Sequence, residues 1–287
     1  MYPGIRVLLL AGLSAAAVVP AMAQGPQNPD GPPVLLRIGR EEVKVGKDAA
    51  HEALEALWAS AYSKTQLPSS YLAMTSMTGP GEAWFLTGYA SWADLEKDTK
   101  AQEANEAYSA ETKKLWAQEG DLLSRASGIM ASYRPAISYR AGSNLAKMRY
   151  MQVQLIRLKP GHVREFFDNW REIVAAHEKA KMDEGWAFYQ VVSGMPDGTY
   201  MYLQPHASLA EIDQSGPMHA ADAYRNAVGE AGRARSLEAT QVAIETSQTL
   251  YFALNPKMSS APKAWMDADS FWAPKPPPPP AKPVAKK

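Results

Sequence analysis

The stretch VQLIRLKPGHVREFFDNW, Val153–Trp170, joins a strand pattern to a helix pattern through a glycine turn. The strand pattern begins at Arg149, and its side chains alternate in character up to Leu158, as in a β-strand with two different faces. Lys159–Gly161 then turns the chain. Apolar residues at intervals of three and four follow, which predicts a helix with one apolar stripe: Val163, Phe166, Phe167, Trp170, Ile173, Val174 and His177.

Four further elements are expected after this helix. Two strands flank the connection Gly194–Gly198, and Ser208 with Glu211 forms a capping box at the start of the next helix. A long helical segment and a last strand complete the unit. The expected elements are Trp186–Ser193, Thr199–Gln204, the helix from Ser208, a helical segment from Pro217 to about Gln248, and Leu250–Leu254. The order is therefore βαββαβ.

The first half of the chain repeats this layout. EAWFLTGYASWADLEKD, Glu82–Asp98, has the pattern of DGTYMYLQPHASLAEID, Asp197–Asp213. Gly46 and Gly161 occupy equivalent turns at an offset of 115 residues (161 − 46), and this offset changes by only two residues up to the helix cap that follows. A nearly constant offset over several elements indicates an internal duplication.

Each βαββαβ unit predicts a ferredoxin-like sheet with helices on one face and an open second face. The segments VQLIRLKPGHVREFFDNW, GWAFYQVVSG and SLAEID resemble the dimeric α+β barrel superfamily, particularly its NIPSNAP-like and antibiotic-biosynthesis-monooxygenase-like members. The resemblance implies an α+β fold in which two tandem ferredoxin-like units, 34–145 and 146–260, form one intrachain α+β barrel. Since this barrel is usually a homodimer in the superfamily, the tandem also implies a monomer built as an internal pseudo-dimer.

The N-terminus has the features of a cleavable signal peptide over residues 1–23. Arg6 precedes an apolar run from Val7 to Val19, and a small-residue cleavage site follows at Ala21–Ala23. The apolar run would extend only about 20 Å as a helix, which is short of the roughly 30 Å of membrane hydrocarbon. We therefore expect a periplasmic or secreted protein with no membrane span after cleavage, rather than an uncleaved tether.

Composition excludes several function classes. The chain has 30 basic and 30 acidic residues among its 287, so it lacks the charge excess of a nucleic-acid-binding protein. It has no cysteine, which excludes thiol nucleophiles, thiolate zinc sites and iron–sulfur clusters. The last segment, 261–287, is rich in proline and lysine and is expected to be a solvated tail, with a role as a cell-envelope or partner-binding tether as the alternative.

Strand parity suggests which residues line the barrel interior. If the apolar positions of each strand face the helices, the interior receives polar and aromatic side chains that could orient a small, partly apolar molecule. The candidate ligand-binding residues on this argument are Arg37, Trp84, Gln152, Gln154, Tyr200, Tyr202 and Gln204. The alternative is that they only fill the seam between the sheets. If Tyr200 faces a pocket, its side chain makes fewer packing contacts than that of Trp170 on the helix stripe. Trp170→Ala should then destabilise the protein far more than Tyr200→Ala.

The five histidines show no metal-binding spacing. No pair has the HExxH or His-x-His pattern, so we expect no metal site. His177 lies on the apolar stripe of its helix, and His206 precedes the Ser208 cap. Both are kept as ligand-binding candidates, although core or helix-end packing is the expected role of His177.

Two functions remain open at this stage. The first is an exported binding or structural module that takes up a small molecule and needs no cofactor. The second, which the resemblance implies, is a cofactor-independent monooxygenase or a haem-associated oxidoreductase that uses the same pocket. No catalytic residue can be assigned from the sequence, and the enzyme alternative therefore rests on the fold.

Overall fold

The computed structural model describes residues 31–65, 67, 69–142, 144–215 and 222–273. The predicted signal peptide and residues 274–287 of the predicted tail lie outside these ranges. The first unit contains β1 (Leu35–Val43), α1 (Asp48–Lys64), β2 (Tyr71–Ser76), β3 (Glu82–Tyr89), α2 (Trp92–Ala104), α3 (Glu106–Glu119) and β4 (Leu123–Tyr133). The second contains β5 (Tyr150–Leu158), α4 (Val163–Ala180), β6 (Ala187–Ser193), β7 (Thr199–His206), α5 (Leu209–Ser215), α6 (Asp222–Ala243) and β8 (Ile244–Leu254).

The eight strands form one closed antiparallel barrel, which confirms the predicted fold class. Their order around the barrel is β1-β3-β2-β8-β5-β7-β6-β4, and β4 pairs with β1 again. Two seams join the units: β2 pairs with β8 through Met74 opposite Leu254, and β4 pairs with β6 through Tyr133 opposite Tyr189. The duplication thus supplies both halves of the barrel within one chain.

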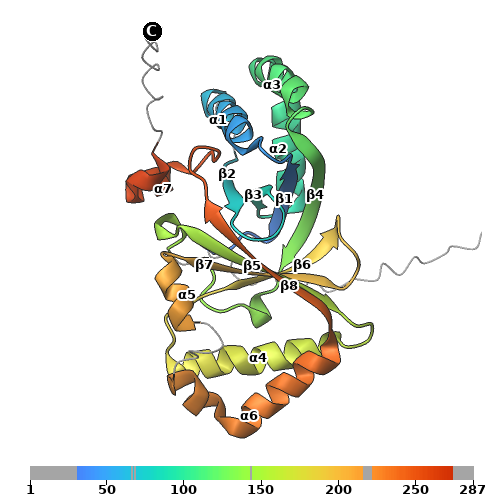
Figure 1. Ribbon diagram of the computed structural model, residues 1–287, viewed down its shortest axis with the longest axis vertical. Coiled ribbons are helices and arrows are strands. Elements are labelled where there is room, and N and C mark those ends of the chain that lie inside the picture. The colour runs from blue at the N-terminus through green and yellow to red at the C-terminus, as the bar shows by residue number, and fades with distance from the viewer. Residues whose placement is uncertain (1–30, 66, 68, 143, 216–221, 274–287) are drawn as a thin grey trace, which may run out of the picture.

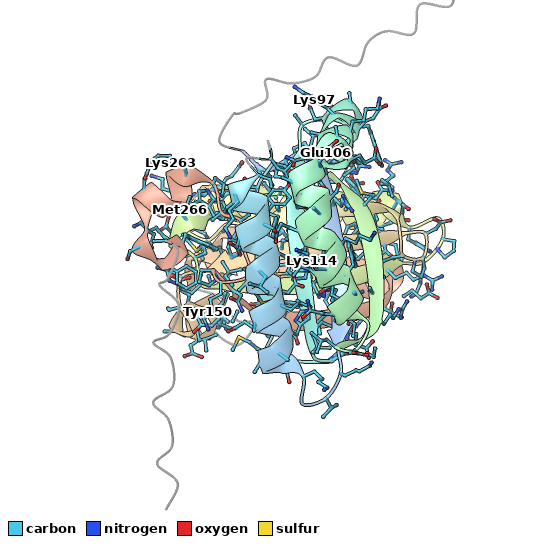
Figure 2. All side chains as sticks on the ribbon, turned by 90° about the horizontal axis from the view of Figure 1, so that it is seen from above. Lys97, Glu106, Lys114, Tyr150, Lys263 and Met266 are labelled. Atoms are coloured by element: carbon cyan, nitrogen blue, oxygen red, sulfur yellow. The ribbon has the colours of Figure 1, made fainter. Side chains whose placement is uncertain are left out.

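Helices cover the outer face of each half-barrel. In Figure 1, α1 and α3 lie on the side of the first unit, and α4 and α6 lie on the opposite side over the second unit. Figure 2 shows α1 and α3 side by side, with Lys114 on the outward surface of α3. The long second-unit helix ends earlier than predicted, because β8 begins at Ile244. None of the helices in the described ranges is long and apolar enough to cross a membrane.

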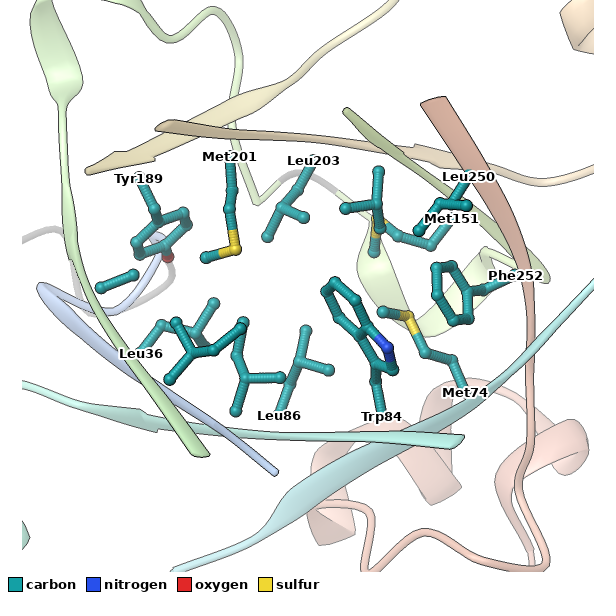
Figure 3. Packing of buried hydrophobic residues seen from close by; sticks show 14 of the residues in the cluster. Leu36, Met74, Trp84, Leu86, Met151, Tyr189, Met201, Leu203, Leu250 and Phe252 are labelled. Carbon is teal, nitrogen blue, oxygen red and sulfur yellow. The ribbon is translucent and has the colours of Figure 1, made fainter. Parts of the chain in front are cut away.

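The parity prediction was wrong for the second unit and for β1, where Leu36 and Ile38 rather than Arg37 face the barrel. Met151, Val153, Met201 and Leu203 point into the barrel and form its core together with Trp84 (Figure 3). The alternate positions of β5 and β7 face the helix layer, where Tyr200 and Tyr202 pack with residues of α4. Both faces of the sheet are buried, so the more apolar set of a strand does not identify which face the helices cover.

Part of the predicted tail is folded. Lys263–Ala268 forms the short helix α7, and Ser270–Trp272 forms a 3-10 turn. Trp272 is 3% exposed and belongs to the barrel core, and its indole N–H donates to the carbonyl oxygen of Ala146 at 2.7 Å. The ion pair of Arg149 with Asp269, at 2.6 Å, holds the segment at the start of β5. The barrel core therefore extends beyond residue 261.

That the protein is a monomer stays a prediction, and the closed barrel gives a physical reason for it. Every strand of the barrel has two neighbours within the chain, so no strand edge is left to pair with a second copy. Light scattering of the purified protein should give one chain mass at all concentrations. A dimer that survives dilution would contradict the prediction.

Candidate functional site

A cavity of about 1640 Å³ opens at one end of the barrel. This end collects the first residues of β1, β2, β5 and β6 and the last residues of β3, β4 and β7. Antiparallel order alternates the strand directions, and it therefore brings segments from both units to one mouth.

The floor of the cavity is apolar. Leu36, Leu86, Met151 and Leu203 line it and are all less than 9% exposed. The remainder of the barrel interior is solid packing, which includes Ile38, Met74, Trp84, Val153, Met201 and Phe252, each fully buried. Figure 3 shows Trp84 pointing into the barrel from the first sheet and Met201 pointing into it from the second. The barrel is thus filled at its centre and open at this mouth.

The second unit supplies a polar wall at the same mouth. The side chain of Glu184 accepts a hydrogen bond from Gln204 Nε2 at 3.3 Å, and Gln204 Oε1 accepts one from the hydroxyl of Tyr202 at 2.8 Å. Glu184 also contacts His177 Nε2 at 2.8 Å. Burial raises the pKa of the Tyr202 hydroxyl well above its usual value, so it stays protonated and can donate. Glu184 and Gln204 line the cavity, and the wall can therefore receive a hydrogen-bonding group.

His206 is the most unusual polar residue of the wall. It is 2% exposed, and its Nε2 has no hydrogen-bond partner. Burial lowers the pKa of its imidazole, while the carboxylates of Glu211 and Glu184 raise it by less. The ring is therefore neutral at pH 7, with a nitrogen that can accept a hydrogen bond or ligate a metal ion.

The tail segment forms one edge of the mouth. Pro262 and Trp265 line the cavity, and Trp265 contacts Trp272 with ring centroids 5.2 Å apart. On the opposite side, the hydroxyl of Tyr189 donates to the carbonyl oxygen of Pro33 at 3.0 Å, which fixes the segment before β1 at the rim. Segments that lie outside the two repeated units, before residue 34 and after residue 260, thus border the mouth.

Only two of the predicted site residues line this cavity, Gln204 and His206. Trp84 does point into the barrel, but it is fully buried, and it donates to Glu82 Oε2 at 2.6 Å beneath the guanidinium of Arg40. The others lie on the helix-facing side of the sheets, for the reason of parity given above: Arg37, Gln152, Gln154, Tyr200 and Tyr202.

His177 is held by the core rather than by a pocket. Its Nδ1 lies 2.7 Å from the carbonyl oxygen of Ile173, and its Nε2 lies 2.8 Å from Glu184 Oε1. The rings of Trp186 and Tyr224 pack on it at 4.7 Å. Since both ring nitrogens have partners, His177 positions Glu184 and is not free to bind a ligand.

Sequence reasoning misplaced two residues of the cavity floor. The apolar character of Met151 and Leu203 assigns them to the helix-covered face, whereas the structure has them inside the barrel. Trp265 was missed because it belonged to the predicted tail. Three aromatic residues, Trp265, Phe271 and Trp272, lie close together in this segment. Such a concentration of large apolar side chains indicates that a segment packs against a core.

No protein-family model matches the sequence, and no curated protein does either. Among solved structures, a candidate monooxygenase from Fusobacterium nucleatum subsp. nucleatum is similar, with a TM-score of 0.51 and 11% identity over 78% of this chain and 93% of that one. An anthrone oxidase-like protein has a TM-score of 0.48 and 10% identity, covering 77% and 91% of the two chains. A chlorite dismutase variant from Candidatus Nitrospira defluvii has a TM-score of 0.44 and 8% identity, and the match covers 84% of this chain and 96% of that one.

These similarities show the fold alone. The protein is an eight-stranded antiparallel α+β barrel made of two ferredoxin-like halves, an architecture that it shares with the monooxygenase-like chain. The mouth cavity adds a site of the kind that such barrels can use for small molecules.

Proposed function

We propose that the protein binds a small, partly apolar molecule in the mouth cavity. The observation that carries this proposal is the cavity itself, which combines an apolar floor with a polar wall on one side. Ligand pockets commonly measure about 300–1,000 Å³. A cavity of about 1640 Å³ therefore has room for such a molecule together with water.

The wall indicates how the ligand would be oriented. Its apolar part would contact Leu36, Leu86 and Leu203, where burial of apolar surface contributes roughly 25 cal/mol per Å². A hydroxyl or amine on the ligand would donate to Glu184 or to the neutral ring of His206. The preferred ligand class is thus an uncharged or cationic amphipathic molecule, because a carboxylate would be repelled by Glu184.

A hydrophobic dye tests the proposal. N-phenyl-1-naphthylamine should become fluorescent in the presence of the wild-type protein. Leu86→Trp, which fills part of the floor, should weaken binding about 10-fold, the effect expected when apolar contacts worth about 1.4 kcal/mol are lost. Leu209→Trp is the matched control, since Leu209 is 43% exposed on α5 and does not line the cavity. Equal affinities in the two variants would place the dye elsewhere.

Haem is the second candidate ligand, and one observation favours it. His206 lines the cavity and has a buried Nε2 without a hydrogen-bond partner, a nitrogen that could bind the haem iron. The aromatic layer beneath α4 does not fit the macrocycle, because Phe166, Trp186 and Phe188 are each at most 2% exposed and fill it. Haem would supply redox chemistry at its iron, and His206 would hold it at the mouth. The cofactor-independent oxygenase stays a prediction based on the fold.

Haem titration separates this candidate from simple binding. If His206 ligates the iron, stoichiometric haem should give a Soret band that His206→Ala abolishes. His162→Ala is the control, because His162 lies outside the cavity at the start of α4. A Soret band that is equal in both variants, or no band in the wild type, would reject haem and leave the small-molecule proposal untouched.

A further inference from the structure

Four ionisable side chains are buried together between the first sheet and its helices, away from the mouth cavity. Glu41 comes from β1, His51 and Glu55 from α1, and Glu119 from the last residue of α3. His51 is 2% exposed, while Glu55 and Glu119 are each 4% exposed. The side chain of Glu41 keeps 16% exposure, so the group reaches solvent at one point. We refer to these four residues as the carboxylate–histidine cluster.

The donor atoms of this cluster are close to one another. His51 Nε2 lies 2.8 Å from Glu41 Oε2 and 4.0 Å from Glu55 Oε1. One donor atom from each of these three residues lies within 4.8 Å of the other two. Donors that sit about 2.0–2.2 Å from a zinc ion are roughly 3 to 4.5 Å apart, so this spacing suits a single ion. The i, i+4 relation of His51 and Glu55 keeps both on one face of α1.

Two oxygen atoms in the cluster lack partners. Glu55 Oε1 and Glu119 Oε2 are buried, and neither has a hydrogen-bond partner. Within the part of the chain that the structure describes, no lysine or arginine forms an ion pair with Glu41, Glu55 or Glu119. Buried carboxylates are ordinarily paired or bound to a metal ion, because an isolated buried charge is costly.

Burial changes the protonation of two carboxyl groups in the cluster. Burial, together with the neighbouring charges of Glu41 and Glu119, raises the pKa of Glu55 to about 9. Burial likewise raises the pKa of Glu119 to about 7. A proton held between Glu55 and Glu119 would also relieve the repulsion among the carboxylates. A shared proton is therefore the alternative that an experiment must exclude.

The second unit shows that the fold does not need these polar residues. At a constant offset of 115 residues (156 − 41, 166 − 51 and 170 − 55), Glu41, His51 and Glu55 correspond to Ile156, Phe166 and Trp170. Those three residues pack in the apolar layer beneath α4. Apolar side chains thus fill the equivalent positions in one half, whereas the other half buries a histidine and carboxylates.

We propose that the carboxylate–histidine cluster is a binding site for one divalent transition-metal ion, held by His51, Glu41 and Glu55, with Glu119 as a fourth ligand or as the partner that orients Glu55. A dication neutralises most of the three carboxylate charges and gives the two unpartnered oxygen atoms a ligand. An imidazole among the donors favours Zn²⁺, Co²⁺ or Fe²⁺ over Mg²⁺ and Ca²⁺. Solvent access at Glu41 provides the entry route.

Calorimetric titration of the chelator-treated protein with Zn²⁺ tests the proposal. One equivalent should bind, and the thermal midpoint should rise as the ion adds its binding free energy to the folded state. Co²⁺ should give visible absorption bands that report nitrogen and oxygen ligation. Glu55→Gln and His51→Gln should each weaken binding by about 100-fold or more, since even residues that only orient ligands contribute 10–100-fold.

The control variants are His162→Gln and Glu165→Gln, which change a pair made of a half-buried histidine and an exposed glutamate, 3.5 Å apart in the second unit. They should bind Zn²⁺ like the wild type. Glu55→Gln preserves shape and removes a buried charge, so it is expected to fold, and circular dichroism of the metal-free variants checks this. The proposal is overturned if the wild type binds neither Zn²⁺ nor Co²⁺, which would leave only the shared proton. It is equally overturned if the cluster and control variants bind alike.

Discussion

Gly194→Ala should cost about 3–5 kcal/mol of unfolding free energy, since strained backbone and overpacking contribute roughly 1–3 kcal/mol each. Gly194 follows β6 and has a φ of +91°, a conformation that residues with a Cβ atom rarely adopt. A Cβ atom there would lie 2.0 Å from the carbonyl oxygen of Gly128 in β4. Because that oxygen belongs to the backbone, a side-chain rotation cannot relieve the clash.

The position of Gly194 makes the effect global. β4 and β6 form one of the two seams that join the units, and the register shifts between Met130 and Ala131 next to this contact. Separation of the strands at Gly194 would therefore open the barrel rather than a surface loop.

Gly46→Ala is the matched control for this prediction. Gly46 has a φ of +79°, but a Cβ atom there would meet nothing within 4 Å. Gly46→Ala should therefore lower the free energy of unfolding only by the cost of the left-handed backbone conformation, about 1–2 kcal/mol. Urea denaturation of both variants measures the difference. If the two losses are equal, the close approach of β6 to β4 is not what stabilises the seam.

Much of the fold could be predicted because duplication makes a local pattern visible twice. The glycine turn at Gly161 and the cap at Ser208 each have a counterpart in the first half, and the structure places the corresponding elements in one barrel. Periodicity identifies elements well, since it depends on neighbouring residues of the chain. Closure of the barrel follows once two open sheet faces exist in one chain.

The site could not be predicted to the same extent, because it depends on which face of each strand is inside. For β7, both alternating sets are buried: Met201 and Leu203 in the barrel, and Tyr200 and Tyr202 under α4. Polarity does not distinguish the two sides, because the hydroxyl of Tyr202 and the amide of Gln204 satisfy each other within the sheet layer.

The carboxylate–histidine cluster shows a second limit of sequence reasoning. The HExxH and His-x-His patterns each require two histidines. This cluster instead combines one histidine with carboxylates from a strand and two helices. The one local signal is His51 followed four residues later by Glu55, on a helix whose equivalent in the second unit carries aromatic residues. Glu41 and Glu119 join it only through tertiary packing.

The corrected parity also reverses the expected effect of Tyr200→Ala, which we now predict to cost about 3–5 kcal/mol, as for other buried aromatic residues. Tyr200 is 2% exposed, and its ring packs on Phe166 and Phe167 with centroids 5.3 and 5.8 Å apart. Trp170, which was expected to matter far more, is only half-buried, although it packs on Phe188 at 4.6 Å. Both rings belong to the same aromatic layer, so their removal should destabilise the protein to a similar extent.

Tyr200→Phe separates packing from hydrogen bonding in this prediction. The variant keeps the ring that contacts Phe166 and loses only the hydroxyl, and it should therefore stay within about 1 kcal/mol of the wild type, the usual net contribution of one hydrogen bond. Urea midpoints of Tyr200→Ala, Tyr200→Phe and Trp170→Ala provide the comparison. A small loss for Tyr200→Ala beside a large loss for Trp170→Ala would restore the original assignment of Tyr200 to a pocket. Equal large losses would instead establish the helix-facing side of the second sheet as solid packing, and the mouth of the barrel would then be the place to look for a ligand.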